Sequence, residues 1–261
     1  MKRLEDKVAL VTGGSSGIGE ATARLFAREG AKVAVLALES EDLERVAEEI
    51  ASSGAEAMAV AADISKADQM ERAVQEVVRR WGRLEILVAN AGINGVWAPL
   101  DELDPDEWRK TIDVNLTGTF FTIKYAAPHL KRQGGSVIIT SSINGTRVFS
   151  NTGATAYSCS KAGQVVMAKM LALELAKHRV RVNAICPGSI ATEIEESTQR
   201  EDLARIREPV EFPEGTIPLT DGEPGSSEEV AELVLFLASD AARHVTGAVV
   251  TVDGAQSLLL A

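Results

Sequence analysis

A glycine-rich turn reads Thr12-Gly13-Gly14-Ser15-Ser16-Gly17-Ile18-Gly19, and it joins the apolar run Val8–Val11 to a helical pattern over Ile18–Glu29. Glycine adopts positive φ angles easily and lets the backbone approach a ligand closely. The free N–H groups at the beginning of the helix favour a phosphate. The spacing, Gly-x3-Gly-x-Gly, differs from the commoner Gly-x-Gly-x2-Gly pattern. The turn predicts a dinucleotide site, and a purely structural turn is the alternative interpretation.

Short apolar runs alternate with helical patterns around this turn and along the whole chain. Most runs are apolar at consecutive positions, which is typical of strands buried on both faces of a parallel sheet. The predicted strands are Val8–Val11, Lys32–Leu38, Glu56–Ala61, Glu85–Ala89, Ser136–Thr140, Arg179–Ile185 and Ala248–Val252. The predicted helices are Ile18–Glu29, Glu41–Ser52, Lys66–Trp81, Pro105–Leu130, Thr155–Lys177 and Ser227–Ala238. We expect the fourth to be two helices, because Gly118 and its β-branched neighbours interrupt it.

Repeated strand–helix–strand units with right-handed crossovers define the expected fold class. It is α/β, a Rossmann-type doubly wound parallel sheet of about seven strands with helices on both faces. No linker divides residues 1–261, so a single domain is expected. Residues 188–225 break the alternation: they contain no predicted strand, and a short helix is expected over Glu195–Arg207. Because ligands bind beyond the carboxyl ends of the strands, where this segment begins, it is a candidate substrate lid.

The composition excludes several classes of protein. The 27 basic and 38 acidic residues give a net charge of −11, which opposes nucleic-acid binding. Two cysteines are too few for a disulfide scaffold or a thiolate zinc site, and the histidines show no ligand pattern, so no metal site is expected. The first residues carry no targeting signal, and no apolar stretch approaches the roughly 18 residues of a membrane span. We expect a cytoplasmic protein without membrane contact.

The end of the second predicted strand bears on the choice between NAD and NADP. It reads Leu36-Ala37-Leu38-Glu39-Ser40-Glu41-Asp42. An acid at this place accepts hydrogen bonds from the ribose of NAD, whereas the 2′-phosphate of NADP requires Arg or Lys. The closest following cation is Arg45, and the three carboxylates would repel a phosphate. The segment favours NAD and leaves NADP open.

Candidate catalytic residues follow later strands. Tyr157 and Lys161 are four residues apart on a predicted helix and share one face. A neighbouring ammonium favours the phenolate, which would bring the tyrosine pKa down from about 10 and allow proton exchange with a substrate oxygen. Ser142, after the fifth predicted strand, could donate a hydrogen bond to the same oxygen. Surface positions for the Tyr–Lys pair and a turn role for the serine are the alternatives.

Five motifs in this order resemble the short-chain dehydrogenase/reductase family in its compact single-domain form. They are Thr12–Gly19, Asn90-Ala91-Gly92, Ser142, Tyr157-x3-Lys161 and Pro187-Gly188, and the resemblance runs from about Lys7 to Gly254. It implies that Asn115 positions a water connecting Lys161 to solvent. It implies cofactor contacts by Gly13, Ser15, Ser16, Gly17, Ile18, Gly19, Asp63, Ile64, Asn90, Ala91, Gly92, Tyr157, Lys161, Pro187, Gly188, Ile190 and Thr192. It also implies a homotetramer formed through the helices that hold Asn115 and Tyr157.

Some features limit what the resemblance implies. Asp63 has a second interpretation as the acid at the beginning of a helix. The segment from Ser142 to Tyr157 is about two residues longer than is common in the family, which is expected to reshape one pocket wall with Arg147, Phe149 and Asn151. Trp97, just beyond the Asn90–Gly92 motif, is a candidate for the pocket border.

The expected function is an NAD(P)-dependent oxidoreductase that interconverts a secondary alcohol and a ketone or aldehyde, with Tyr157 as general acid/base. The alternatives are a 3-oxoacyl-(acyl-carrier-protein) reductase and a non-catalytic dinucleotide-sensing regulator; a sugar-nucleotide epimerase would need a larger C-terminal domain. Between Glu193 and Glu223 ten acids face three cations, Arg200, Arg205 and Arg207. Such a charge opposes an acidic carrier protein. A small-molecule substrate, an uncharged hydroxy compound or sugar, is favoured.

Overall fold

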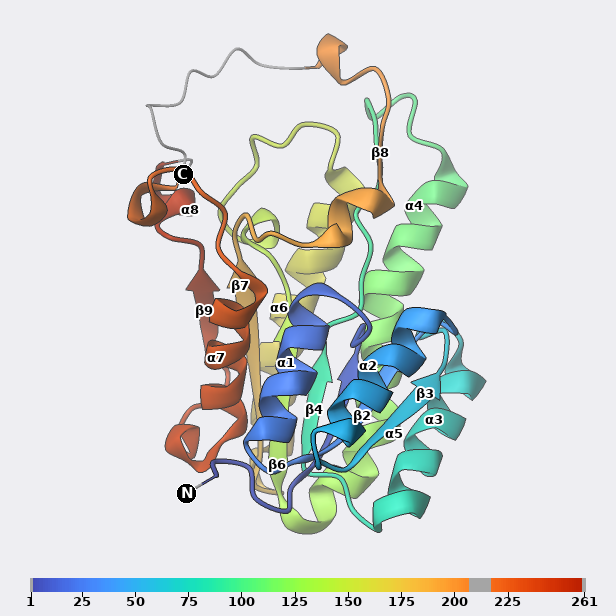
Figure 1. Ribbon diagram of the computed structural model, residues 1–261. Coiled ribbons are helices and arrows are strands. Elements are labelled where there is room, and N and C mark those ends of the chain that lie inside the picture. The colour runs from blue at the N-terminus through green and yellow to red at the C-terminus, as the bar shows by residue number, and fades with distance from the viewer. Residues whose placement is uncertain (1, 207–216, 260–261) are drawn as a thin grey trace.

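The computed structural model describes residues 2–206 and 217–259. Its centre is a sheet of seven parallel strands in the order β3-β2-β1-β4-β6-β7-β9 (Figure 1). The strands are β1 Val8–Thr12, β2 Lys32–Ala37, β3 Ala57–Ala61, β4 Ile86–Ala89, β6 Gly135–Thr140, β7 Val180–Pro187 and β9 Val249–Val252. The predicted doubly wound parallel sheet is confirmed, because the strand order runs outward in both directions from β1 and β4.

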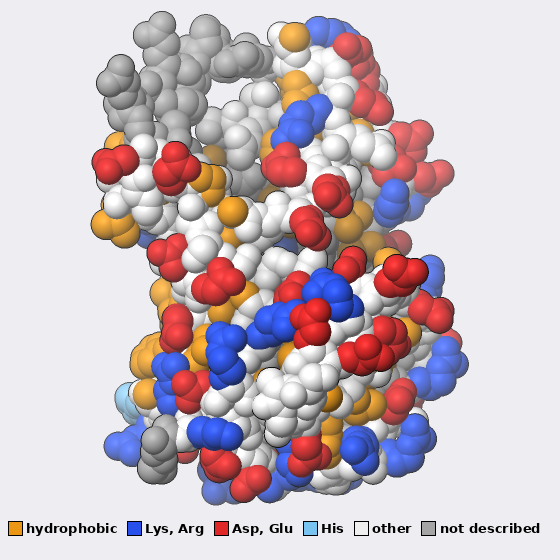
Figure 2. All heavy atoms as spheres, viewed as in Figure 1, with side chains coloured by type: hydrophobic (Ala, Val, Ile, Leu, Met, Phe, Trp, Pro, Cys, Tyr) orange, Lys and Arg blue, Asp and Glu red, His pale blue; other side chains and the backbone are white. Residues whose placement is uncertain are grey.

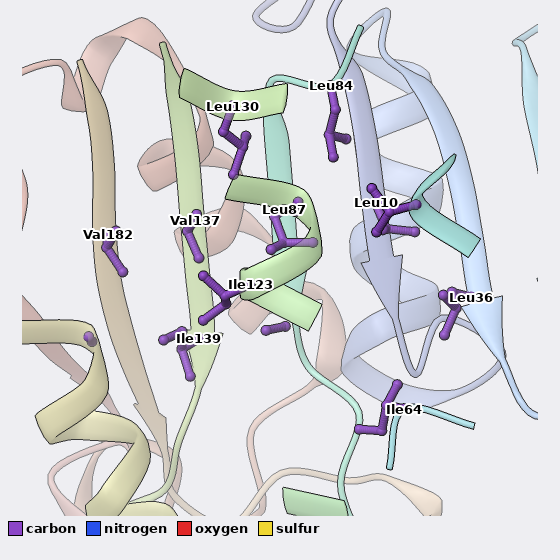
Figure 3. Close-up of a cluster of buried hydrophobic side chains, with 14 of the residues drawn as sticks. Leu10, Leu36, Ile64, Leu84, Leu87, Ile123, Leu130, Val137, Ile139 and Val182 are labelled. Atoms are coloured by element: carbon purple, nitrogen blue, oxygen red, sulfur yellow. The ribbon is translucent and has the colours of Figure 1, made fainter. Parts of the chain in front are cut away.

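Helices cover both faces of the sheet. The helices α1 Gly17–Arg28, α2 Glu41–Ser52 and α7 Ser227–Ala238 pack on one face through one apolar cluster. The helices α3 Ala67–Trp81, α5 Gly118–Gln133 and α6 Thr155–Ala176 pack on the other through a second cluster. In Figure 3, Leu87 and Val137 from the strands point toward Ile123 and Leu130 of α5. The short helix α8, Gln256–Leu259, follows β9.

The predicted interruption near Gly118 takes the form of a π-helical turn. Helix α4, Pro105–Ile112, continues without a break through the π segment Asp113–Thr117 into α5. The expected two α-helices are confirmed, with the second beginning at Gly118, but a wider π-helical turn joins them in place of an interruption. A Cβ on Gly118 would lie 2.8 Å from the Ile64 side chain, so glycine permits this close approach. The π segment contains Asn115, one of the predicted catalytic residues.

The candidate lid contains a strand that the sequence did not predict. Strand β8, Thr198–Arg200, pairs in parallel with β5, Gly95–Trp97, to form a second, two-stranded sheet. The helix expected over Glu195–Arg207 is wrong: 3-10 turns at Glu193–Ser197 and Leu203–Arg205 flank β8. Three-residue strands are too short to show periodicity, and the partner lies about a hundred residues away. Arg207 and the prolines Pro209 and Pro213 lie outside the described residues.

The two ends of the candidate lid are bonded to each other. The Ala191 N–H donates to the Gly225 carbonyl at 2.9 Å, and the Gly225 N–H donates to the Ser189 carbonyl at 3.0 Å. Ile190 and Gly225 form a parallel bridge. The first residues of the candidate lid and its last residue, Gly225, therefore lie side by side, just after the carboxyl end of β7.

Charged side chains dominate the face that Figure 2 shows, with basic and acidic groups interleaved over α1 and α2. Arg24 donates to Glu20 at 2.7 Å and to Glu49 at 2.5 Å, which joins the two helices. Arg45 lies near the same carboxylates, 3.7 Å from Glu20 and 3.6 Å from Glu49. Within residues 2–206 and 217–259, no helix combines the length and the apolar character needed to cross a membrane.

Candidate active site

A cavity of about 710 Å³ opens at the carboxyl edge of the sheet. It lies where the strand order reverses between β1 and β4, the place where doubly wound sheets bind ligands. The cavity brings together most of the residues that the sequence singled out. These are Gly13, Ser16, Gly17, Ile18, Asn90, Ala91, Gly92, Ser142, Tyr157, Lys161, Pro187, Gly188, Ile190 and Thr192.

The glycine turn forms one end of the cavity, and its shape requires glycine. Gly13 has φ +63°, and a Cβ there would lie 2.9 Å from the Ala91 backbone. A Cβ on Gly19 would collide with the Gly13 carbonyl oxygen. Ser16 occupies the N-cap position of α1, but its side chain makes no hydrogen bond to the helix. The first backbone N–H groups of α1 therefore remain available to a ligand. These features fit the pyrophosphate of a dinucleotide.

Thr12, at the end of β1, ties the glycine turn to the end of β4. Its hydroxyl donates to the Val88 carbonyl at 3.3 Å and accepts from the Asn90 and Ala91 N–H groups at 3.0 and 3.2 Å. The Asn90 amide also donates to the Gly13 carbonyl at 3.3 Å. The sequence analysis included Thr12 in the motif but gave its hydroxyl no role, because that role depends on a neighbouring strand about eighty residues away.

The predicted catalytic pair lies on the inner face of α6. Tyr157 is 8% exposed and Lys161 is 3% exposed. The Lys161 ammonium lies 5.6 Å from the centre of the Tyr157 ring and donates to the Thr140 carbonyl, at the end of β6, at 2.9 Å. Ser142 follows β6 and is also buried. The surface interpretation of the Tyr–Lys spacing is therefore wrong.

Burial dominates the ionisation of these groups. It lowers the pKa of Lys161 from 10.5 to about 8, because the ammonium loses water. It also raises the pKa of Tyr157 above 10, and a hydrogen bond with Ser142 opposes that rise. The sequence predicted a tyrosine pKa lowered by the lysine. For the protein alone that prediction is wrong, since desolvation of the phenolate outweighs the other influences.

Asn115 lies behind the cavity rather than in its wall. Its side-chain amide accepts from the Ile93 N–H at 2.8 Å and donates to the Ile93 carbonyl at 2.9 Å and the Ser160 hydroxyl at 3.1 Å. Its backbone carbonyl accepts from the Gln164 amide and the Thr119 hydroxyl, both at 2.7 Å. Asn115 therefore joins the segment after β4 to α6. The role of Asn115 in positioning a water stays a prediction. Its backbone carbonyl already accepts two hydrogen bonds, from Thr119 and Gln164.

Four further predicted cofactor residues are not part of the cavity wall: Ser15, Gly19, Asp63 and Ile64. The Asp63 carboxylate accepts from the Ser65 N–H at 2.8 Å and from the Ser65 hydroxyl at 2.7 Å. This is the local role that the alternative interpretation gave it, as an acid just before α3. Ile64 is buried beside Gly118. Contact of Asp63 and Ile64 with adenine stays a prediction.

The far end of the cavity contains side chains that the sequence analysis mostly missed. Trp97 borders it, as predicted, and so does Asn151 from the longer segment after Ser142. The Asn151 amide donates to Asn144 at 3.2 Å, so the two amides share one wall. Phe149 of the same segment is exposed instead. Glu193, Glu195, Ser197 and Arg200 come from the predicted lid, although the sequence did not single them out as pocket residues, and it gave no sign of Asn94 and Gln256.

The titratable side chains do not assemble into a metal site in the part of the chain that the structure describes. Within it, no three His, Cys, Asp or Glu residues are placed to hold an ion. The polar groups on the cavity wall are the hydroxyls, amides and charged groups named above. The arrangement can bind a nucleotide at one end and exchange a proton with a substrate beside it.

Comparison with known proteins identifies relatives that are named as reductases and as a dehydrogenase. The family model described as enoyl-(acyl carrier protein) reductase matches residues 13–255. The 3-oxoacyl-[acyl-carrier-protein] reductase FabG of Thermotoga maritima is 40% identical over 257 residues, 97% of this chain and 98% of that protein. The L-rhamnose 1-dehydrogenase (NAD(P)(+)) of Azotobacter vinelandii is 40% identical over 258 residues, 96% of each chain.

A solved structure is more similar still. The crystal structure of a 3-ketoacyl-ACP reductase from Sinorhizobium meliloti 1021 is 52% identical, covers 97% of this chain and 99% of its own, and superimposes with a TM-score of 0.93. The match to the family model, residues 13–255, includes the glycine turn from Gly13 onward and both Tyr157 and Lys161. The chain therefore belongs to the short-chain dehydrogenase/reductase family, and it is an NAD(P)-dependent oxidoreductase that acts on CH–OH groups.

Proposed function

We propose that this enzyme interconverts a secondary alcohol, in a small uncharged hydroxy compound or a sugar, and the corresponding ketone or aldehyde. The observation that carries the proposal is the buried Tyr157, Lys161 and Ser142 group on the wall of the cavity that begins at the glycine turn. The proposed roles are general acid/base for Tyr157, support of its ionisation for Lys161, and an oxygen anchor for Ser142. Asn115 is proposed as the residue that positions a relay water.

The proposed reaction divides the work between cofactor and protein. The bound nicotinamide supplies a hydride for reduction and accepts one during oxidation. In the direction of reduction, Tyr157 donates its phenolic proton to the substrate oxygen while Ser142 donates a hydrogen bond to it. In oxidation Tyr157 accepts that proton. The Lys161 ammonium, 5.6 Å from the ring centre, favours the phenolate that remains after donation.

The cofactor would lie along the cavity from the glycine turn to the end of β7. Backbone groups at Gly13, Gly17 and Ile18 are proposed to hold the pyrophosphate, and Ile190 and Thr192 the nicotinamide carboxamide. The remaining proposed contacts are those of Ser15, Ser16, Gly19, Asp63, Ile64, Asn90, Ala91, Gly92, Tyr157, Lys161, Pro187 and Gly188. Residues 188–225 are proposed to act as the substrate lid of a single domain.

NAD is the proposed preferred cofactor. The tip of β2 ends in Leu38 and Glu39, both exposed. Arg45, the nearest following cation, donates to Asp42 at 3.1 Å and lies near two more carboxylates. A guanidinium engaged in this way offers little attraction for a 2′-phosphate, while Glu39 repels it.

The charge of the candidate lid supports a small uncharged substrate. Arg200 is paired with Glu195 at 2.6 Å, and Arg205 is paired with Glu102. Acids of the same segment, such as Glu196 and Glu201, are exposed. A surface of this kind repels an acidic carrier protein. The second candidate, 3-oxoacyl-(acyl-carrier-protein) reductase, is favoured by the similarity to proteins of that name.

Assembly is proposed from exposed apolar side chains on two neighbouring helices. The exposed faces of α5 and α6 carry Phe120, Val166, Met170 and Leu173, which are between 46% and 84% exposed. Apolar side chains in such number on neighbouring helices favour association with further copies. We propose a homotetramer formed through these helices, in the cytoplasm.

Replacement of Tyr157 by Phe tests the proposed chemistry. The variant Tyr157→Phe should lower kcat/KM by at least about a thousandfold, because it removes the proton donor while keeping the ring. Its affinity for the reduced cofactor, measured by fluorescence titration, should stay within a few fold of the wild type. Tyr125→Phe, at the other tyrosine of the chain, is the matched control. Retained turnover in Tyr157→Phe would refute the role.

Cofactor preference is tested by titration with NADH and NADPH. NADH should bind at least about fivefold more tightly, the effect expected of one uncompensated charge near the 2′-phosphate. Glu39→Lys should narrow that ratio or reverse it. Glu48→Lys makes the same charge change nine residues further along the chain, in α2, and should leave the ratio nearly unchanged. Equal or tighter binding of NADPH by the wild type would contradict the preference.

The substrate class is tested by a panel assayed at low salt with both cofactors. We expect kcat/KM for at least one neutral hydroxy compound or sugar to exceed that for a 3-oxoacyl group on its carrier protein. The physical reason is repulsion between the acidic lid and an acidic carrier, so added salt should raise the activity on the carrier-bound substrate. Higher kcat/KM on the carrier-bound substrate at low salt would establish the second candidate instead.

A further inference from the structure

An ion pair lies at the far end of the cavity, away from the glycine turn. The Arg200 guanidinium donates to the Glu195 carboxylate at 2.6 Å and lies 5.2 Å from the centre of the Trp97 ring. All three side chains line the same cavity as Tyr157. Glu195 is near enough to Tyr157 to raise the pKa of that phenol. The pair therefore faces the space that a substrate would fill.

The small sheet of β5 and β8 holds Arg200 in this place. Trp97 and Arg200 are register partners, so their side chains are neighbours across the two strands. The Asn94 N–H donates to the Ser197 hydroxyl at 3.0 Å, and the Glu201 N–H donates to the Trp97 carbonyl at 2.9 Å. These hydrogen bonds lie just before and just after β8 along the chain, so they fix its backbone. The Arg200 guanidinium then lies between two partners, the Trp97 ring and the Glu195 carboxylate.

The charges on the cavity wall decide what this pair does. Among the described residues of the wall, the Lys and Arg side chains are Lys161 and Arg200, and the carboxylates are Glu193 and Glu195. Lys161 is buried against the Thr140 carbonyl. Arg200 is thus the cation that a carboxylate or phosphate on a substrate would seek, since guanidinium binds such groups strongly. Glu195 already occupies it.

We propose that Glu195 is a specificity-determining residue that keeps Arg200 from binding anionic substrates. With the ion pair intact, a substrate carrying a carboxylate or phosphate meets Glu193 and Glu195 without a free guanidinium to offset them. A neutral substrate loses no binding affinity, because it has no charge to pair with Arg200. The inference rests on the proposed function and explains its substrate class. The Glu195 carboxylate is the group through which the pocket selects neutral carbonyl and hydroxy compounds.

Binding of a matched pair of ketones tests the proposal without turnover. The probes are acetoacetate and its methyl ester, which differ in one negative charge, titrated by calorimetry into the Tyr157→Phe protein saturated with NADH. Introducing Glu195→Gln should lower the Kd of acetoacetate, relative to that of the ester, by at least about fivefold. Glu196→Gln is the matched control. It makes the same charge change in the same 3-10 turn, at a side chain outside the cavity wall, and should change the ratio little.

A double variant tests whether Arg200 is the group that binds acetoacetate once Glu195 is replaced. In Glu195→Gln with Arg200→Gln the gain in acetoacetate binding should disappear, because the guanidinium is gone. The proposal is overturned if Glu195→Gln gains no acetoacetate binding, if Glu196→Gln gains as much, or if the double variant keeps the gain. These outcomes concern binding alone. Failure of the proposed function appears separately, as turnover that survives Tyr157→Phe.

Discussion

The buried hydrogen bond from the Lys161 ammonium to the Thr140 carbonyl is the interaction on which the site depends. It joins α6 to the carboxyl end of β6 in a place from which water is largely excluded. Burying an ammonium is costly unless it finds a partner, and here a strand-end carbonyl accepts from it. The bond fixes the lysine on the inner face of α6, so the tyrosine one helical turn earlier must face the cavity as well.

Close packing around this bond positions the third member of the group. The Ser141 hydroxyl donates to the Lys161 carbonyl at 2.8 Å, and a Cβ on Gly145 would lie 2.6 Å from the carbonyl carbon of the same lysine. Only glycine lets the chain after β6 pass this near to α6. Ser142 is therefore held beside Tyr157 by backbone geometry. On the opposite side, Asn115 and Ser160 join the same helix to the end of β4.

Much of this could be predicted from the sequence, because it depends on local pattern. Consecutive apolar runs identify parallel strands, the glycine turn follows the first of them, and Tyr157 and Lys161 are one helical turn apart. What could not be predicted depends on contacts between distant segments. Strand β8 exists because β5 pairs with it, and a short polar run shows no sign of this. The cavity role of Glu195 and Arg200 follows from the same pairing.

One wrong prediction and one that stays open depend on packing in the same way. The sequence shows that Lys161 is near Tyr157 but does not show how deeply both are buried, and burial reverses the direction of the tyrosine pKa shift. It likewise could not show whether the Asp63 carboxylate faces a ligand or the Ser65 N–H, because both fit an acid just before a helix. In each case the sequence gives the residue's place along the chain, while its surroundings depend on packing.

The stability difference between the wild type and Lys161→Met, followed against pH by urea unfolding, tests the buried ammonium most directly. The unfolded chain keeps the lysine proton up to about pH 10.5, whereas the folded protein releases it near pH 8. Between these values the unfolded state binds more protons, so the wild type should gain stability relative to Lys161→Met as the pH rises. The gain should approach about 3 kcal/mol, and the difference should be constant below pH 8. A difference that stays flat from pH 8 to 10.5 would contradict the account.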